Sequence, residues 1–316
     1  MFEITSPRGG AIAAQYVQVP PRASGRGGIW NHGRVTALGL SRPPPIGVFD
    51  SGVGGLTVLH ELLVRLPHED FLYLGDTARF PYGERTADEL QSFAVQIADL
   101  LLQRGARILI AACNAATAAA LPALEAHVAA AAPAVPVLGV VTPGCRLAAA
   151  STTNGRVGLL ATTATVRSGA YERALAASSP ELELVSVPCP DLAPIVQTGF
   201  PFDRRVVDTA RAYCRPLRAA GVDTVILGCT HYPLVAPMLQ RSLGPEVRLI
   251  ASGAAVAGEV QRVLEERELS TPREDEGDYR FLCTGDVEEF RELGTRFLQM
   301  PLERVEHVDL LAELAA

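Results

Sequence analysis

Two cysteines lie in similar sequence surroundings and could act together as acid and base. Residues 107–114 (RILIAACN) and 223–230 (DTVILGCT) each contain a short apolar run just before a cysteine, Cys113 or Cys229. A thiol at a strand end ahead of a helix lies near the positive end of the helix dipole, so we expect its pKa to fall below the usual value of about 8.5. Two such thiols on opposite faces of a substrate could remove a proton from one face of a carbon and deliver one to the other, which inverts the carbon.

Polar residues accompany both of these cysteines. Asn114 follows Cys113, and Thr230 and His231 follow Cys229. The remaining four cysteines are Cys145, Cys189, Cys214 and Cys283. They have no counterpart in the other half of the chain, so we expect them to be inert core residues. A metal site is not predicted, because no two cysteines have C-x-x-C spacing and the six histidines are scattered.

The two cysteine segments belong to a longer internal repeat. Residues 46–48 (IGV) resemble residues 157–159 (VGL), and each segment lies a similar distance before its cysteine. Such self-similarity indicates two half-chains of similar topology. Each half then places one cysteine at the carboxyl end of a buried strand, where open α/β sheets bind their ligands.

Short apolar runs alternate with amphipathic stretches from Ile46 onward. The first run ends at Asp50 and turns through residues 51–55 into a helix predicted at residues 56–66. The further predicted strands are residues 71–74, 107–111, 135–140, 157–160, 182–187, 224–227, 248–250 and 280–282. This alternation is typical of parallel sheets with crossover helices. We therefore expect an α/β fold of two pseudo-symmetric domains with parallel-type sheets and an active site in the interdomain cleft.

Composition excludes several classes of enzyme and of binding protein. All 28 basic residues are arginine, which rules out pyridoxal-phosphate enzymes, Schiff-base aldolases and Walker A loops because each needs a lysine. The turn at residues 52–55 (GVGG) lacks the G-x-G-x-x-G spacing of a dinucleotide site. With 48% apolar and 20% charged residues, the chain has the composition of a globular protein. Residues 46–316 carry net negative charge, which argues against nucleic acid as a partner.

Several features indicate a cytoplasmic protein with reduced thiols. The uncharged runs at residues 108–124 and 126–145 are alanine-rich and interrupted by proline, so neither is predicted to span a membrane. The N-terminus lacks the apolar core of a secretory signal, and six cysteines are too few for a disulfide scaffold in 316 residues. Residues 1–45 are rich in glycine, proline and arginine, and we expect a disordered leader or an overextended start there. The sequence leaves the oligomeric state open, a homodimer included.

Four motifs resemble those of the glutamate racemase family, a branch of the aspartate/glutamate racemase superfamily. They are residues 47–58 (GVFDSGVGGLTV), 73–77 (YLGDT) with 81–83 (PYG), 112–114 (ACN) and 228–233 (GCTHYP). The resemblance runs from about Ile46 to the C-terminus. It implies that residues 46–137 and 252–316 form a first α/β domain and residues 138–251 a second.

The resemblance also implies an activity. The expected reaction is a cofactor-independent interconversion of L- and D-glutamate, by deprotonation and reprotonation at Cα. The substrate is then glutamate itself, and no cofactor is called for. The product D-glutamate serves peptidoglycan synthesis, and with it cell-wall biogenesis and cell shape.

Individual residues acquire roles by the same resemblance. Cys113 is expected to act on D-glutamate with Asp50 beside it, and Cys229 on L-glutamate with His231 beside it. The residues expected to bind the amino acid are Asp50, Ser51, Tyr82, Gly83, Asn114, Ala115, Thr230 and His231. Hydroxyls, amides and backbone N–H groups at helix N-termini suit two carboxylates beside a thiolate.

Two positions depart from the family pattern. Ala115 stands where the family commonly has threonine or serine, so a hydroxyl is lost and the backbone N–H remains, a change worth about 1 kcal/mol of binding. Gln197, in residues 194–197 (PIVQ), stands where the family often has glutamate. Glutamine forms hydrogen bonds but cannot titrate, which argues against a proton relay at this position. We interpret both departures as variation within a working enzyme.

Two alternatives to a glutamate racemase follow from the same residues. One is an aspartate racemase or a related two-cysteine epimerase, which the depth of the pocket at the side-chain carboxylate would distinguish. The other is a gyrase-binding protein of the same fold, with the arginine-rich leader as an interaction arm. Intact Cys113 and Cys229 favour catalysis, since a pure binding role would require neither thiol.

Overall fold

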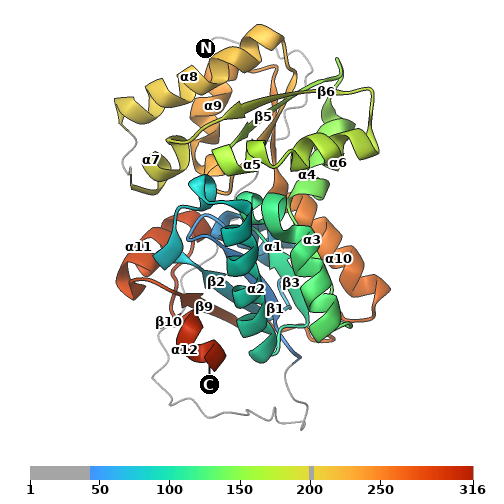
Figure 1. Ribbon diagram of the computed structural model, residues 1–316, viewed down its shortest axis with the longest axis vertical. Coiled ribbons are helices and arrows are strands. Elements are labelled where there is room, and N and C mark those ends of the chain that lie inside the picture. Colours follow the sequence, from blue (N-terminus) through green and yellow to red (C-terminus); the bar gives the residue numbers. More distant parts are fainter. Residues whose placement is uncertain (1–42, 199–202, 316) are drawn as a thin grey trace, which may run out of the picture. The chain divides into compact units, whose positions relative to one another are not determined.

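Two parallel sheets with flanking helices make up the part of the chain that the computed structural model describes, residues 43–198 and 203–315 (Figure 1). Among the described strands, every pair of neighbours is parallel. The α/β class with parallel sheets is therefore confirmed. The predicted leader at residues 1–45 lies outside the described residues, except for residues 43–45.

The larger sheet has six described strands in the order β10-β9-β2-β1-β3-β4. Their bounds are Ile46–Asp50 (β1), Phe71–Gly75 (β2), Ile108–Ala111 (β3), Val137–Gly139 (β4), Tyr279–Cys283 (β9) and Val305–His307 (β10). The smaller sheet has four described strands in the order β6-β5-β7-β8. Their bounds are Arg156–Ala161 (β5), Glu183–Pro188 (β6), Thr224–Gly228 (β7) and Arg248–Ala251 (β8).

The strand orders reproduce the internal repeat of the sequence. In the larger sheet β1 lies between β2 and β3, and β4 follows β3. In the smaller sheet β5 lies between β6 and β7, and β8 follows β7, so the order is the same. β3 and β7, the strands before the two cysteines, therefore occupy equivalent positions in their sheets. β9 and β10 extend the larger sheet at one edge.

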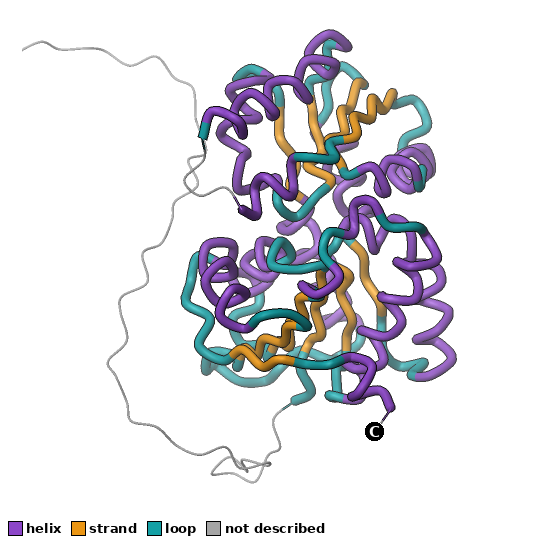
Figure 2. The backbone as a smooth tube through the Cα atoms, turned by 60° about the vertical axis from the view of Figure 1, so that its left-hand side comes forward, coloured by secondary structure: helices purple, strands orange, loops and turns teal. Residues whose placement is uncertain are grey.

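Helices connect the strands and cover the sheets (Figure 2). Their bounds are Leu56–Arg65 (α1), Ala87–Gln103 (α2), Asn114–Ala131 (α3), Val141–Ser151 (α4), Thr163–Arg167 (α5), Ala170–Ser178 (α6), Leu192–Thr198 (α7), Arg204–Ala220 (α8), Ala236–Leu243 (α9), Ser252–Glu266 (α10), Val287–Leu298 (α11) and Leu310–Ala315 (α12). Short 3₁₀ turns lie at Thr77–Arg79, Tyr82–Glu84 and Tyr232–Val235. None of the described helices is long and apolar enough to cross a bilayer.

Alternation along the strands explains why their sequences are almost entirely apolar. In β3, Ile108 and Ile110 join the core shared with α1, α10 and α11, whereas Leu109 and Ala111 join the core shared with α2 and α3. Successive side chains in a strand point to opposite faces, so a sheet covered on both faces needs apolar residues at every position. The smaller sheet is covered in the same way, by α4 and α6 on one face and α8 and α9 on the other.

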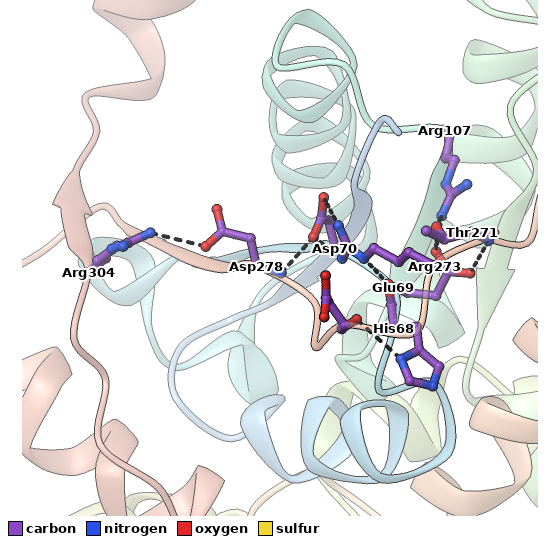
Figure 3. A network of polar contacts seen from close by, with 9 residues as sticks. His68, Glu69, Asp70, Arg107, Thr271, Arg273, Asp278 and Arg304 are labelled. Carbon is purple, nitrogen blue, oxygen red and sulfur yellow. Dashed lines mark hydrogen bonds and ion pairs between the residues drawn. The ribbon is translucent and has the colours of Figure 1, made fainter. Parts of the chain in front are cut away.

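A buried polar network holds the amino ends of the larger sheet together (Figure 3). Glu69, which precedes β2, accepts hydrogen bonds from the guanidinium of Arg107 and from the hydroxyl and backbone N–H of Thr271. Asp70 pairs with Arg273 and accepts the Asp278 N–H. Residues 271–278, which lead into β9, are thus fixed to the ends of β2 and β3, at the opposite end of the strands from the two cysteines.

The division into domains stays a prediction. β4 lies in the larger sheet and β8 in the smaller one, and the chain returns to the larger sheet through α10 and β9. The described residues from Pro43 onward belong to one compact unit, in which core residues such as Ile46 and Leu227 share one hydrophobic cluster.

Candidate active site

The carboxyl ends of three strands bring the predicted chemical groups together. β1 ends at Asp50, β3 is followed within two residues by Cys113, and β7 is followed directly by Cys229. A pocket at these strand ends is lined by Ser51, Phe80, Pro81, Tyr82, Gly83, Glu84, Cys113, Asn114, Ala115, Thr162, Pro190, Ala193, Pro194, Gly228, Cys229, Thr230 and His231. Both thiols therefore face one cavity, and residues of both sheets form its wall.

Nine of the ten predicted site residues line this pocket, and Asp50 lies beneath it. Asp50 is fully buried and reaches the wall through Thr230, whose hydroxyl donates a hydrogen bond of 3.3 Å to Asp50 Oδ1. Of the described residues that line the pocket, none is lysine or arginine, and Glu84 is the one carboxylate. An anionic ligand would therefore have to bind through N–H and hydroxyl groups.

Burial gives Asp50 an unusual acidity. The carboxyl group is removed from water, which raises its pKa from 3.8 to about 6. The backbone N–H groups of Gly55, Gly52 and Ser51 and the Thr230 hydroxyl act in the opposite direction, because they stabilise the carboxylate. Asp50 is thus a carboxylate at neutral pH that can accept a proton without a large free-energy change.

Burial also raises the pKa of the Cys113 thiol. The thiol lies at the N-cap of α3, and burial followed by the negative charge of Asp50 raises its pKa from 9.0 to about 12. The backbone N–H of Ala116 in the first turn of α3 lowers it, as does Ser51. A neutral thiol next to a carboxylate that can accept its proton is the resting state of this half of the site.

Cys229 has an imidazole as its neighbour. The Sγ atom of Cys229 lies 3.9 Å from Nδ1 of His231, and Nε2 of His231 lies 2.9 Å from Oε1 of Gln197. Burial lowers the pKa of His231 to about 3, so the ring is neutral, and burial raises the pKa of Cys229 well above its usual value. The second half of the site thus pairs a neutral thiol with a neutral base.

The expected lowering of the thiol pKa values is wrong for the protein without ligand. Burial outweighs the helix dipole at Cys113, although α3 has 18 residues. At Cys229 the element that follows is a four-residue 3₁₀ turn, Tyr232–Val235, so its dipole is smaller than that of an α-helix. Burial therefore keeps both thiols in the neutral form.

Two glycines allow the strand ends to approach each other. A Cβ atom at Gly54 would lie 2.4 Å from the Thr230 hydroxyl, and one at Gly55 would lie 2.5 Å from the Cβ of Asp50. Both distances are shorter than any normal contact, so only glycine fits. The glycine-rich turn after β1 is thus explained by packing against Asp50 and Thr230, and the expectation that it binds no dinucleotide still rests on the sequence spacing.

Tyr82 is held by the buried carboxylate of Asp76, which lies in the 73–77 motif but was not among the predicted site residues. The Tyr82 hydroxyl donates a hydrogen bond to Asp76 Oδ2, and Nε of Arg79 lies 2.6 Å from the same atom. The hydroxyl of Thr284 donates to Asp76 Oδ1 over 2.8 Å. Asp76 is fully buried, the Arg79 guanidinium balances its charge, and the two hydroxyls complete its hydrogen bonds. It fixes the position of Tyr82 in the wall of the pocket.

Asn114 is held by a residue that carried no signal in the sequence. Its Oδ1 accepts a hydrogen bond of 2.6 Å from the hydroxyl of Tyr171, which lies in α6 and is fully buried. Tyr171 follows no catalytic motif, and only the packing of α6 against α3 brings it to the site. Thr162, the N-cap of α5, also lines the pocket and contacts the Gly83 backbone region. Among the described residues, no group of three His, Cys, Asp or Glu side chains is placed to bind a metal ion.

Comparisons with known proteins identify the family. A sequence model described as Asp/Glu/Hydantoin racemase matches residues 57–260. The glutamate racemase of Geobacter metallireducens is 42% identical over 268 residues, which are 85% of this chain and 97% of the relative. The chain belongs to the glutamate racemase family. The four motifs of the sequence had indicated this family, and that prediction is confirmed.

Solved structures of glutamate racemases have the same fold. Glutamate racemase isoform RacE1 from Bacillus anthracis superposes with a TM-score of 0.80 at 37% identity, over 84% of this chain and 98% of that one. Glutamate racemase from Francisella tularensis, solved in complex with D-glutamate, gives 0.79 at 34% identity, over 85% and 98%. The glutamate racemase fold therefore covers nearly all of the described residues, including both sheets.

Proposed function

We propose that this protein interconverts L- and D-glutamate through Cys113 and Cys229, without a cofactor, and so supplies D-glutamate for peptidoglycan in the cytoplasm. The observation that carries the proposal is the pair of thiols at equivalent strand ends of two sheets, both facing one pocket. Membership in the glutamate racemase family and the D-glutamate complex of the Francisella relative support glutamate as the substrate.

Binding of glutamate would rest on neutral groups. The pocket offers the Asn114 amide, the Ser51 hydroxyl and the N-terminus of α3, which contributes backbone N–H groups. The Thr230 hydroxyl donates to Asp50, so its oxygen serves as an acceptor. The α-ammonium group of the substrate brings a positive charge next to the thiols. A nearby opposite charge favours the ionised form, so substrate lowers the pKa of both thiols from their values in the empty pocket.

In the D-to-L direction, Cys113 acts as the base. Asp50 accepts the thiol proton of Cys113, and the resulting thiolate takes the Cα proton of D-glutamate. The thiol of Cys229 then donates its proton to the opposite face of the carbanion. Protons and charge balance, because the proton removed from one face is replaced by one from the other.

In the L-to-D direction, the roles reverse. Nδ1 of His231 accepts the proton of the Cys229 thiol, over the observed 3.9 Å separation, which must shorten when substrate fills the pocket. The Cys229 thiolate removes the Cα proton of L-glutamate, and Cys113 delivers a proton to the other face. Each direction therefore uses its own helper, Asp50 or His231.

The experiment that tests the proposal is an assay of the purified chain with each enantiomer of glutamate and of aspartate, without added cofactor. We expect racemisation of glutamate from both sides and at least about 100-fold lower kcat/KM for aspartate, because one missing methylene leaves the side-chain carboxylate out of reach of its partners. Faster turnover of aspartate would assign the chain to the aspartate racemase alternative. No turnover of any of the four would contradict the proposal.

A further inference from the structure

Gln197 contacts the imidazole of the site from the side opposite Cys229. It lies in α7, is half-buried, and its Oε1 accepts a hydrogen bond from Nε2 of His231 over 2.9 Å. The same oxygen would lie 3.8 Å from a Cβ atom at Gly52, so it also reaches the turn after β1. Gln197 therefore lies between the His231 imidazole and the turn that follows β1.

This hydrogen bond determines which imidazole nitrogen carries the proton. An amide oxygen only accepts hydrogen bonds, so Nε2 of His231 must be protonated. A neutral imidazole has one N–H group, and burial keeps His231 neutral. Nδ1 is consequently an unprotonated nitrogen, and it is this atom that faces the Cys229 thiol.

The groups that surround the ring add no competing partner among the described contacts. The aromatic rings of Phe80 and Phe297 pack against it, with centroids 5.6 and 5.1 Å away. The titratable groups near this region are Cys229, Cys113, Asp50 and Cys189, and Asp50 is linked to it through Thr230. Among the described residues, no carboxylate forms an ion pair with His231, and the polar partners of its two ring nitrogens are Cys229 and Gln197.

We propose that Gln197 is a positioning residue that holds His231 in the Nε2–H tautomer, so that Nδ1 can accept the Cys229 proton in the L-to-D direction. The inference rests on the proposed racemase function. A glutamate at this position would accept the same hydrogen bond, but its negative charge would stabilise the imidazolium. Glutamine fixes the tautomer of the ring without adding this charge, so Nδ1 of His231 stays unprotonated throughout the working pH range.

Two substitutions separate the effect of the hydrogen bond on the tautomer from the effect of charge at position 197. Gln197→Leu removes the acceptor at similar volume, so the tautomer is no longer fixed, and kcat with L-glutamate should fall about tenfold while KM changes little. Gln197→Glu keeps the acceptor, so kcat with L-glutamate should stay within about threefold of the wild type at high pH. The added charge raises the pKa of His231, and a protonated ring cannot accept the thiol proton. The acid limb of kcat with L-glutamate should therefore move to higher pH in this variant.

The measurement combines kinetics with ¹⁵N NMR of the full chain labelled at histidine. The His231 signals are assigned by their loss in His231→Asn. We expect a protonated Nε2 and an unprotonated Nδ1 in the wild type and in Gln197→Glu at high pH, and a mixture of tautomers in Gln197→Leu. Gln91→Leu is the matched control, since Gln91 is also half-buried and donates to the carbonyl of Ala119, away from the pocket. It should change neither the tautomer nor kcat.

The outcomes distinguish this proposal from the proposed function. An unchanged Nε2–H tautomer in Gln197→Leu would overturn the proposal, and so would an equal loss of kcat in both directions with a lowered melting temperature, which indicates a structural role only. If Gln197→Leu does not fold, Gln197→Glu still decides, because an unshifted acid limb contradicts the account. A wild-type chain without glutamate racemase activity would contradict the proposed function instead, and the NMR comparison would then decide whether Gln197 sets the tautomer.

Discussion

The hydroxyl of Tyr171 donates a hydrogen bond of 2.6 Å to Oδ1 of Asn114 and joins α6 to the N-terminus of α3. An amide whose oxygen is occupied presents its NH₂ group to other partners, and a substrate carboxylate is an acceptor. Tyr171 thus determines which end of the Asn114 amide serves the pocket. Its own hydroxyl proton is committed, and burial raises the pKa of Tyr171 well above 10.

Tyr171→Phe should therefore weaken substrate binding more than it slows the chemistry. We expect KM for both enantiomers to rise about tenfold, since a hydrogen bond to a charged group is worth about 1.5–3 kcal/mol, while kcat stays within about twofold. Tyr213→Phe, which removes a hydroxyl that donates to Asp191 over 2.9 Å, should change neither constant. Equal KM values for wild type and Tyr171→Phe would show that the Asn114 amide is held without this hydroxyl.

The two helper groups should affect opposite directions. Asp50→Asn should lower kcat with D-glutamate by about 10²-fold or more and kcat with L-glutamate less, and His231→Asn should do the reverse. The equilibrium constant between enantiomers is one, so kcat/KM must stay equal in both directions and only kcat can reveal the asymmetry. Steady-state kinetics from both enantiomers give this comparison. Equal losses of kcat in both directions for both variants would mean that the groups only position substrate.

The pH dependence should reflect Asp50. Its pKa is raised to about 6, and only the carboxylate can accept the Cys113 proton, so activity is present above this pKa and is lost as the pH falls through it. We expect kcat/KM for both enantiomers to decrease below about pH 6 in the wild type, and this limb to be absent in Asp50→Asn. His231, with a pKa lowered to about 3, should add no limb near neutrality. A wild-type profile that is flat down to pH 5 would contradict the assignment of Asp50.

Stability should depend on the network at the other end of the sheet (Figure 3). Arg107→Met leaves the buried Glu69 carboxylate without its guanidinium partner, which should lower the free energy of unfolding by about 3–5 kcal/mol. Activity of the remaining folded protein should be unchanged, because the network lies at the amino ends of the strands. Arg156→Met is the control, since its 3.6 Å pair with Glu183 is exposed and should contribute less than about 1 kcal/mol. Urea unfolding measures both values, and similar losses in the two variants would contradict the prediction.

The sequence predicted the strands of the fold because each is covered on both faces. All nine predicted strands are present, and their ends shift by at most two residues, as for β4 at Val137–Gly139. β10 was missed, since Val305–His307 is a three-residue edge strand whose residues are only half-buried or exposed. The repeat of short apolar segments ahead of Cys113 and Cys229 was enough to predict equivalent strands, because identical connection rules act on both halves.

The sequence predicted which residues line the candidate site better than it predicted their pKa values. Motifs next to strand ends located nine lining residues, because parallel strands bring their carboxyl ends to one edge. Tyr171 could not be found in this way, since it acts through Asn114 and only the packing of α6 brings it there. Asp76 directly follows β2 within the 73–77 motif, but its role is seen only in its hydrogen bond to Tyr82. The direction of the thiol pKa shifts also depends on how much water reaches the sulfur atoms, which local sequence does not specify.

The central claim is that two thiols exchange protons on opposite faces of Cα, and racemisation in D₂O tests it most directly. Starting from L-glutamate, we expect the D-glutamate formed at low conversion to carry deuterium at Cα. The remaining L-glutamate should keep its protium, because the thiol on one face only removes a proton and the thiol on the other face only delivers one in each turnover. The same pattern should appear from D-glutamate. Deuterium entering unreacted substrate as fast as product, or product that retains the original proton, would contradict a two-thiol mechanism at Cys113 and Cys229.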